Sequence, residues 1–359
     1  MKAPTTALLA EGAFGDEGAS KTAYGILRYV PESVLAVIDS EHAGRDAFQV
    51  SGLGRGIPVV RDLAAAIALG AKRLVIGVAP AGGALPEKWR RDIVRALKKG
   101  MEVVSGLHTM LGEDEEFQAA AEEGGGRIVD LRRVPEDLDI AICRAQEVSA
   151  AVVLTVGTDC NTGKMTTALE LAGEGTRRGI ETRFCATGQT GIAIAGWGIA
   201  VDHAISDFTA GAAERLVLEA GKDKNVKLIV VEGQGALAQP MYSGVTLSLM
   251  HGSLPDALIL CHRATQRKMD HVELPMPPLA EHVKMYEQAM RLVKPAKVKA
   301  IALNTRGLDE DSARRASETA QRETGLPAGD PIRFGAGFLL DAILEDSLKK
   351  VPLYSGPPR

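Results

Sequence analysis

The stretch from Val156 to Leu171, VGTDCNTGKMTTALEL, contains the clearest candidate for a phosphate-binding loop. An apolar run precedes it and a helical pattern follows it, which is the order of strand, glycine-rich turn and helix that such a loop requires. Backbone N–H groups of the turn and the amino end of the helix can surround phosphate oxygens, and a lysine can reach the outer phosphates. The residues expected to bind phosphate are Gly157, Thr158, Asp159, Asn161, Thr162, Gly163, Lys164, Met165 and Thr166.

Met165 stands where the usual motif places the serine or threonine that binds Mg²⁺. A thioether is a poor ligand for this hard cation, which prefers oxygen ligands. Thr166 is one residue later, where a helix turns the side chain by about 100°. The loop therefore favours a diphosphate grip without a metal. If Mg²⁺ is used, Thr166 and Glu232 are the candidate ligands.

Polar residues follow several apolar runs in the second half of the chain, where a parallel sheet would place its ligand. Glu232, Asp207 and His262 are the candidate general bases, and the residues leave the choice among them open. Asn304 ends a late run and is a candidate for reading an adenine edge, or simply caps the next helix. The other residues expected to contact a substrate are Gln189, Gln234, Ser243, Arg263 and Arg306.

The segment QPMYSGVTLSLMHGS after Glu232 is unusual for a nucleotide-binding fold. It indicates either a lid over the carboxyl edge of the sheet or a structural connector. As a lid it would bring Tyr242 near the site, where its hydroxyl group or the backbone N–H groups of the Gly-Gln turns can polarise a carbonyl group.

Short β-branched runs alternate with helical patterns over almost the whole chain, which predicts an α/β protein built from βαβ units. We expect two doubly wound parallel-sheet domains, a Rossmann-like domain over residues 1–140 and a P-loop NTPase-like catalytic domain over residues 141–359. The predicted strands are TALLAEG, SVLAVID, RLVIGVA and MEVVSG in the first domain, and AVVLTVG, TRFCATG, NVKLIVVEG, DALILCH and VKAIALN in the second. The segment EDEEFQAAAEEGGGRIVDLRRVPEDLDI between the two series predicts a closing helix, a further strand and a charged connector.

Composition narrows the classes of function. The 359 residues are 45% hydrophobic and 25% charged, with a formal net charge of −4, which is typical of soluble globular proteins. No block of lysines and arginines offers a surface for nucleic acid. We expect no signal peptide, no membrane span and a cytoplasmic location. The four cysteines lie far apart without the spacing of a zinc site.

The N-terminal half carries a weaker glycine pattern. EGAFGDEGASKTAYGIL places Gly12, Gly15 and Gly18 between a predicted strand and a predicted helix, and Asp39 ends the next strand. This spacing differs from the dinucleotide fingerprint G-x-G-x-x-G, so it does not indicate NAD. A supporting role for this domain is the expectation.

The loop spacing GTDxxxGK resembles dethiobiotin synthetase, and the whole chain resembles a family of P-loop proteins with a Rossmann-like N-terminal domain that includes D-glutamate N-acetyltransferases. The matching words are GTDCNTGKMTTALEL, ATGQTGI, SDFTAGAAE, VEGQGAL, YSGVTLSLMHGS, LCHR and LNTRGL. They spread over residues 150–310. The KMTT form of the loop is itself a feature of this family.

The resemblance implies that acetyl-CoA is the co-substrate and that an acidic amino acid, D-glutamate, accepts the acetyl group in D-amino acid catabolism. The loop would hold the diphosphate of coenzyme A. Arg263 and Arg306 would grip the two carboxylates. Because P-loop relatives of this type often pair, we also expect a homo-oligomer.

Two other readings stay open on the residues. One is an ATP-dependent and Mg²⁺-dependent ligase, or carboxylate-activating enzyme, of the dethiobiotin synthetase type. Lys164, Glu232 and Asn304 agree with this function, whereas Met165 counts against it. The other is a nucleotide-dependent switch that binds a protein partner. The many polar residues at the predicted strand ends favour a small-molecule substrate pocket over the switch.

Overall fold

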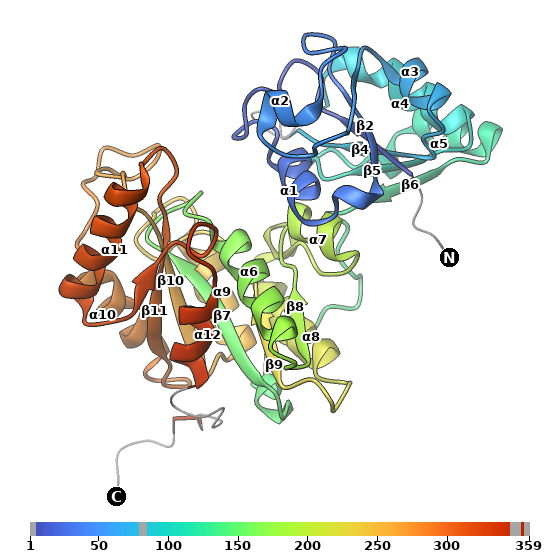
Figure 1. Ribbon diagram of the computed structural model, residues 1–359. Coiled ribbons are helices and arrows are strands. Elements are labelled where there is room, and N and C mark those ends of the chain that lie inside the picture. Colours follow the sequence, from blue (N-terminus) through green and yellow to red (C-terminus); the bar gives the residue numbers. More distant parts are fainter. Residues whose placement is uncertain (1–4, 79–84, 345–352, 355–359) are drawn as a thin grey trace, which may run out of the picture. The chain divides into compact units, whose positions relative to one another are not determined.

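The computed structural model describes residues 5–78, 85–344 and 353–354, and its contacts divide the chain into two units (Figure 1). The first unit comprises Met1–Arg133 and Gln189–Ala200, and the second comprises Val134–Gly188 and Val201–Arg359. The chain therefore passes between the two units three times. No helix among the described residues combines the length and the apolar character needed to cross a bilayer.

The first unit is built on a six-stranded parallel sheet in the order β3-β2-β1-β4-β5-β6. This is the strand order of the Rossmann fold. The strands are β1 (Thr6–Leu9), β2 (Val34–Ile38), β3 (Val59–Val60), β4 (Arg73–Ile76), β5 (Glu102–Ser105) and β6 (Arg127–Asp130). The helices are α1 (Lys21–Tyr29), α2 (Ala47–Ser51), α3 (Leu63–Ala68), α4 (Glu87–Lys98), α5 (Glu115–Gly124) and, from later in the chain, α7 (Gln189–Ala195).

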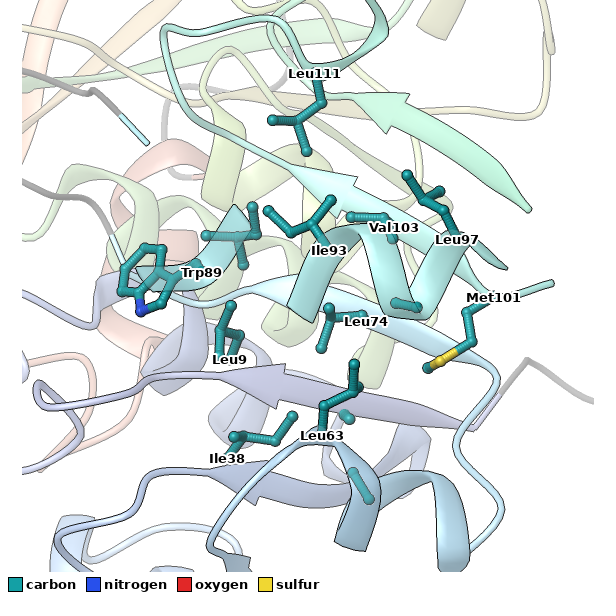
Figure 2. Packing of buried hydrophobic residues seen from close by; sticks show 14 of the residues in the cluster. Leu9, Ile38, Leu63, Leu74, Trp89, Ile93, Leu97, Met101, Val103 and Leu111 are labelled. Carbon is teal, nitrogen blue, oxygen red and sulfur yellow. The ribbon is translucent and has the colours of Figure 1, made fainter. Parts of the chain in front are cut away.

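Alternate residues of these strands enter two different cores, as the two-residue period of a strand requires. On β1, Leu9 belongs to one apolar cluster and Leu8 to the other. Figure 2 shows the first cluster, in which Trp89, Ile93 and Leu97 of α4 lie over the sheet. Their spacing of four residues puts all three side chains on one face of that helix.

Helix α7 packs in the first unit although it follows a strand of the second unit. Ala193 and Ile194 contact the second apolar cluster, to which α1 contributes Tyr24. The hydroxyl groups of Thr190 and Thr22 lie 2.9 Å apart. The division expected at residue 140 placed this segment in the second domain, whereas its apolar contacts group it with the first unit.

The second unit is also a six-stranded parallel sheet, in the order β12-β11-β10-β7-β9-β8, so the predicted α/β class is confirmed. Its strands are β7 (Ala151–Gly157), β8 (Thr182–Cys185), β9 (Leu228–Val231), β10 (Ala257–Arg263), β11 (Lys297–Asn304) and β12 (Ala328–Gly329). Its helices are α6 (Lys164–Arg177), α8 (Ser206–Ala220), α9 (Ser243–Ser253), α10 (Leu279–Met290), α11 (Glu310–Thr324) and α12 (Gly337–Leu344). The strands β3 and β12, two residues each, were not predicted from the sequence.

The second sheet positions the candidate site through β7 and its two neighbours. Every residue of β7 is buried, as expected for a strand covered on both faces. β10 pairs with β7 on one side and β9 pairs with it on the other. Because all three strands run in the same direction, their carboxyl ends meet at one edge of the sheet.

Short helical turns of the 3₁₀ type connect some of these elements. They are Pro31–Ser33 and Leu111–Glu113 in the first unit, and Arg144–Glu147 and Val201–His203 in the second.

Candidate functional site

The phosphate loop lies between the end of β7 at Gly157 and the start of α6 at Lys164. A β-carbon on Gly157 would lie 2.7 Å from Thr162 Oγ1 and 2.8 Å from Lys164 Nζ. Gly163 has a φ of 102°, in the left-handed region that other residues rarely adopt. The tight turn therefore requires both glycines. The N–H groups that open α6 have no partners within the helix and face the turn.

The other predicted loop residues lie in the same turn or directly after it. Thr158, Asp159 and Thr162 are buried, Asn161 is exposed with a φ of 55°, and Met165 and Thr166 are half-buried in the first turn of α6.

Lys164 is a buried cation with uncharged hydrogen-bond acceptors. Its Nζ donates to Asp159 O at 2.8 Å and to Thr162 Oγ1 at 3.5 Å. Burial lowers the pKa of Lys164, and nearby groups that include the carboxylates of Asp159 and Glu232 act in the opposite direction. A phosphate group beside Nζ would supply the anionic partner that a desolvated ammonium favours.

The carboxylate of Asp159 holds three segments of the second unit together. Oδ1 accepts hydrogen bonds from Cys160 N at 2.6 Å and Gln239 Nε2 at 3.0 Å, and Oδ2 accepts from Gln266 Nε2 and Asp270 N, both at 2.6 Å. Burial alone would raise the pKa of Asp159, but these hydrogen bonds lower it below its usual value. Both oxygens are thus engaged by the protein.

Tyr286 of α10 supports the same turn from beneath. Its buried hydroxyl group donates to Gly157 O at 2.6 Å and accepts from Leu237 N at 3.0 Å. Burial raises the pKa of Tyr286, so the phenol stays protonated and keeps its donor role.

Glu232 lies directly after β9 and is almost fully buried. Its Oε2 accepts hydrogen bonds from Thr187 N at 2.9 Å and Gly188 N at 3.2 Å. Burial raises the pKa of Glu232 to about 7, although these two bonds and Lys164 act to lower it. A carboxyl group with this pKa can exchange a proton near neutral pH.

Gln234 lies beside the same turn, where its Nε2 donates to Thr187 Oγ1 at 3.2 Å. A β-carbon on Gly188 would lie 2.4 Å from that Nε2. The N–H groups of Thr187 and Gly188 already donate to Glu232, and that of Gly233 donates to Thr155 Oγ1 at 2.9 Å. The backbone N–H groups of these turns were expected to polarise a carbonyl group. In the structure they instead donate to Glu232 and to Thr155 at the edge of the sheet.

His262 lies at the end of β10, with Nδ1 2.9 Å from Thr158 Oγ1. Burial lowers its pKa to about 4, and His282, Arg267 and Arg263 add to that shift. The ring is therefore neutral at pH 7. It lines a pocket of about 360 Å³ together with Gln266.

The two arginines predicted to grip carboxylates have different surroundings. Arg263 Nη2 forms an ion pair with Asp270 Oδ1 at 2.6 Å, so its charge is already matched. Arg306 is exposed, and its backbone N–H donates to Asn304 Oδ1 at 3.1 Å. Asn304 therefore uses its amide oxygen to close the turn after β11, near Gly163 of the phosphate loop.

The remaining predicted residues are more dispersed. Asp207 is exposed in the first turn of α8, and Gln189 begins α7 in the first unit, where its side chain packs against Gly106. Ser243 begins α9, and Tyr242, the residue before it, is 46% exposed. Thr246 of this helix donates to Gln234 O at 2.7 Å, which anchors α9 to the turn after Glu232.

The glycine-rich turn of the first unit is filled by the protein itself. Phe14 is fully buried, and its N–H donates to Asp39 Oδ2 at 3.0 Å. Asp39 Oδ1 accepts from Glu41 N at 2.9 Å. Asp39 thus stabilises two turns with the carboxylate that a dinucleotide fold would offer to a ribose.

Reasoning from the sequence missed Gln239, Gln266, Asp270 and Tyr286. These residues contact the site from loops and a helix, and no local motif marks them. Tyr286 lies 129 residues from its partner Gly157 along the chain. Only the fold brings such pairs together.

The chain matches two family models. Residues 139–340 match the domain of unknown function DUF1611_C, described as a P-loop domain. Residues 40–134 match DUF1611_N, described as a Rossmann-like domain. Both descriptions agree with the two sheets.

Similar proteins cover almost the whole chain. A D-glutamate N-acetyltransferase of Tritonibacter scottomollicae is 39% identical over 342 residues, 94% of this chain and 98% of the relative. A D-glutamate N-acetyltransferase of a Pseudoalteromonas species is 36% identical over 276 residues, 76% of this chain and 81% of the relative. The crystal structure of a DUF1611 family protein from Anabaena variabilis superimposes with a TM-score of 0.90 at 39% identity, over 95% of this chain and 99% of that one.

The resemblance inferred from the loop and strand-end words is thereby confirmed, and both curated relatives are named as N-acetyltransferases. With the two family models and the matching crystal structure, the chain belongs to the DUF1611 family and combines the Rossmann-like and P-loop domains that the two models describe.

Proposed function

We propose that this protein is an N-acetyltransferase that transfers an acetyl group from acetyl-CoA to the amino group of D-glutamate. The names of two relatives at 36% and 39% identity support the reaction. The observation that carries the role of the loop is Lys164, a buried ammonium whose acceptors among the described residues are uncharged oxygens beside the helix N-terminus. That arrangement suits a bound diphosphate, which coenzyme A carries.

The loop suits the diphosphate of coenzyme A, and one of its residues fits coenzyme A better than a phosphoryl donor. The diphosphate would contact the backbone of the turn and Lys164, as in other phosphate loops. Met165 occupies the position of the usual magnesium ligand, and acyl transfer from a thioester needs no metal. The thioester supplies an activated acyl group, so the protein has to position the amine and remove its proton.

Glu232 is the residue that we propose as general base. Its pKa of about 7 lets it accept a proton at neutral pH, whereas the neutral His262 has a pKa of about 4. Asp207, the third candidate, is exposed on α8, where solvent is the alternative partner. The hydrogen bonds from Thr187 N and Gly188 N fix the orientation of the Glu232 carboxylate.

The test is release of free thiol from acetyl-CoA by the purified full-length protein, with D-glutamate present or absent and EDTA present throughout. Thiol release that depends on D-glutamate, with N-acetyl-D-glutamate identified by mass spectrometry, is the expected result. Its absence would overturn the proposal. A parallel assay with ATP and Mg²⁺ tests the ligase alternative, which ADP formation would support.

The role of the loop has its own test in Lys164→Gln. Loss of one charge-assisted contact to phosphate should raise the KM for acetyl-CoA about 10- to 100-fold, with the KM for D-glutamate unchanged. Lys222→Gln is the matched control, because Lys222 pairs with Glu219 at the surface. An unchanged KM for acetyl-CoA in Lys164→Gln would show that the loop does not hold the donor.

A further inference from the structure

The pocket that His262 lines lies at the ends of β10 and β11, under α10 and α11. Its volume of about 360 Å³ is sufficient for a small organic molecule. His262 and Gln266 are its buried polar residues. The apolar part of its wall includes Leu279, Leu303, Ala316 and Ala320.

Three charged side chains stand at the exposed rim of this pocket: Arg267, Arg315 and Glu323. Arg267 forms no ion pair with any residue that the structure describes, and Arg315 donates to the uncharged Ser312 Oγ at 2.7 Å. Glu323 Oε1 accepts from Ala280 N at 3.3 Å. The rim thus offers two cations and one anion.

The histidines of this region add no charge at neutral pH. Burial lowers the pKa of His262 to about 4, and it lowers the pKa of the neighbouring His282 to about 4 as well. Gln266 is held by its Nε2, which donates to Asp159 at 2.6 Å. The side-chain charges of the pocket therefore stay at two positive and one negative.

We propose that this pocket binds the acceptor amino acid, with Arg267 and Arg315 gripping its two carboxylates. The two cations complement the two carboxylates of a dicarboxylic amino acid. An arginine on the loop after β10 and another on α11 approach the ligand from separate elements, so each can take one carboxylate in a bidentate contact. The inference rests on the proposed acetyl transfer to D-glutamate and names the residues that select the acceptor.

This assignment differs from the two arginines expected from the sequence. Arg263 is paired with Asp270 at 2.6 Å and would have to give up that partner to bind a ligand. Arg267, four residues later, lines the pocket and is free of such a pair within the described part of the chain.

The experiment compares Arg267→Gln and Arg315→Gln with two matched neighbours, Lys268→Gln and Arg314→Gln. Lys268 pairs with Glu273 and Arg314 pairs with Glu310, and neither lines the pocket. In each pocket variant the KM for D-glutamate should rise about 10- to 100-fold, because one charge-assisted grip is lost. The KM for acetyl-CoA should stay unchanged, and the two control variants should behave as the wild type.

A second readout separates carboxylate recognition from general damage. The wild type should have a higher kcat/KM for D-glutamate than for D-glutamine, which lacks the second carboxylate. This ratio should decrease in the variant, Arg267→Gln or Arg315→Gln, that has lost the arginine bound to the side-chain carboxylate. An unchanged KM for D-glutamate in both variants would overturn the inference. A raised KM for acetyl-CoA in place of D-glutamate would also overturn it, since the pocket would then hold the donor.

Direct binding distinguishes failure of this inference from failure of the proposed function. Calorimetric titration of the full-length wild type with D-glutamate, without acetyl-CoA, should show binding that Arg267→Gln and Arg315→Gln weaken. If no acetyl transfer occurs but this binding pattern holds, the proposed reaction fails and the pocket assignment stands. If transfer occurs while binding is insensitive to both substitutions, the pocket assignment fails alone.

Discussion

At the scale of single residues, Glu232 is the group whose environment has the clearest kinetic consequence. Burial raises its pKa to about 7, and only the deprotonated form can accept a proton. The kcat/KM for D-glutamate should therefore increase with pH through an inflection near 7. In Glu232→Gln that inflection should disappear and kcat should fall about 10²- to 10⁴-fold. A pH profile that keeps its inflection in the variant would show that another group is the base.

The raised pKa of Glu232 also predicts an effect on stability: the substitution that lowers activity should make the folded protein more stable. Because the folded state holds the proton of Glu232 more tightly than the unfolded chain does, ionisation between pH 4.5 and about 7 destabilises the fold. Glu232→Gln removes this cost and keeps an oxygen for Thr187 N and Gly188 N. Above pH 7 the variant should gain on the order of 3 kcal/mol in its free energy of unfolding, measured with urea. If the free energy of unfolding depends on pH equally in the wild type and in Glu232→Gln, the prediction is wrong.

At the scale of elements, Asp159 joins the phosphate loop to the loops after β9 and β10. Its four donors all point hydrogen atoms at the carboxylate, so the amide of Asp159→Asn would face at least one of them with its own N–H group. We expect a loss of about 2–4 kcal/mol in the free energy of unfolding. Asp137→Asn, at an exposed pair with Arg215, is the control and should leave the free energy of unfolding nearly unchanged. A small effect at Asp159 would mean that these loops are held in other ways.

Helix α10 carries a second buried polar group, His282. Neither ring nitrogen has a hydrogen-bond partner among the described residues, and burial lowers the pKa of His282 to about 4. The unfolded chain therefore binds a proton more readily, and stability decreases as pH falls from 6.5 towards 4.

The substitution His282→Leu removes this titrating group and leaves a side chain of similar volume. The loss of stability on acidification should therefore be smaller than in the wild type, as thermal unfolding between pH 4 and pH 7 would show. His271→Asn is a suitable control, because His271 is exposed and has a φ of 64° that asparagine tolerates. An unchanged acid transition in His282→Leu would refute the prediction.

At the scale of the whole molecule, the segment Gln189–Ala200 makes the two units interdependent. A fragment of residues 134–359 would expose the face of α7 that carries Ala193 and Ile194, which pack in the first unit. We expect this fragment to bind a hydrophobic dye and to aggregate. Replacing residues 189–200 in it by a glycine-serine linker should reduce both effects. A monomeric fragment without dye binding would argue against this dependence.

The sequence by itself determined the α/β class and the phosphate loop. The reason is physical locality: strand, turn and helix follow one another within residues 151–177, and the conformations of Gly157 and Gly163 depend on atoms of the same turn. Alternation of apolar runs with helical patterns likewise predicts parallel strands, because each connection must cross over the sheet. The candidate base Glu232 was accessible in the same way, since it directly follows a strand.

Only the tertiary structure decided which side chains are free to act. Asp159 accepts hydrogen bonds from Gln239 and Gln266, which lie 80 and 107 residues away along the chain. No sequence motif identifies these partners of its carboxylate. Arg263 stands at the end of a predicted strand, which made it a candidate, but it is paired with Asp270. Arg267, four residues later, lines the pocket. Helix α7 joins the first unit because its apolar face packs there. Burial and pairing depend on contacts between distant segments, and these exist only once the sheets have formed.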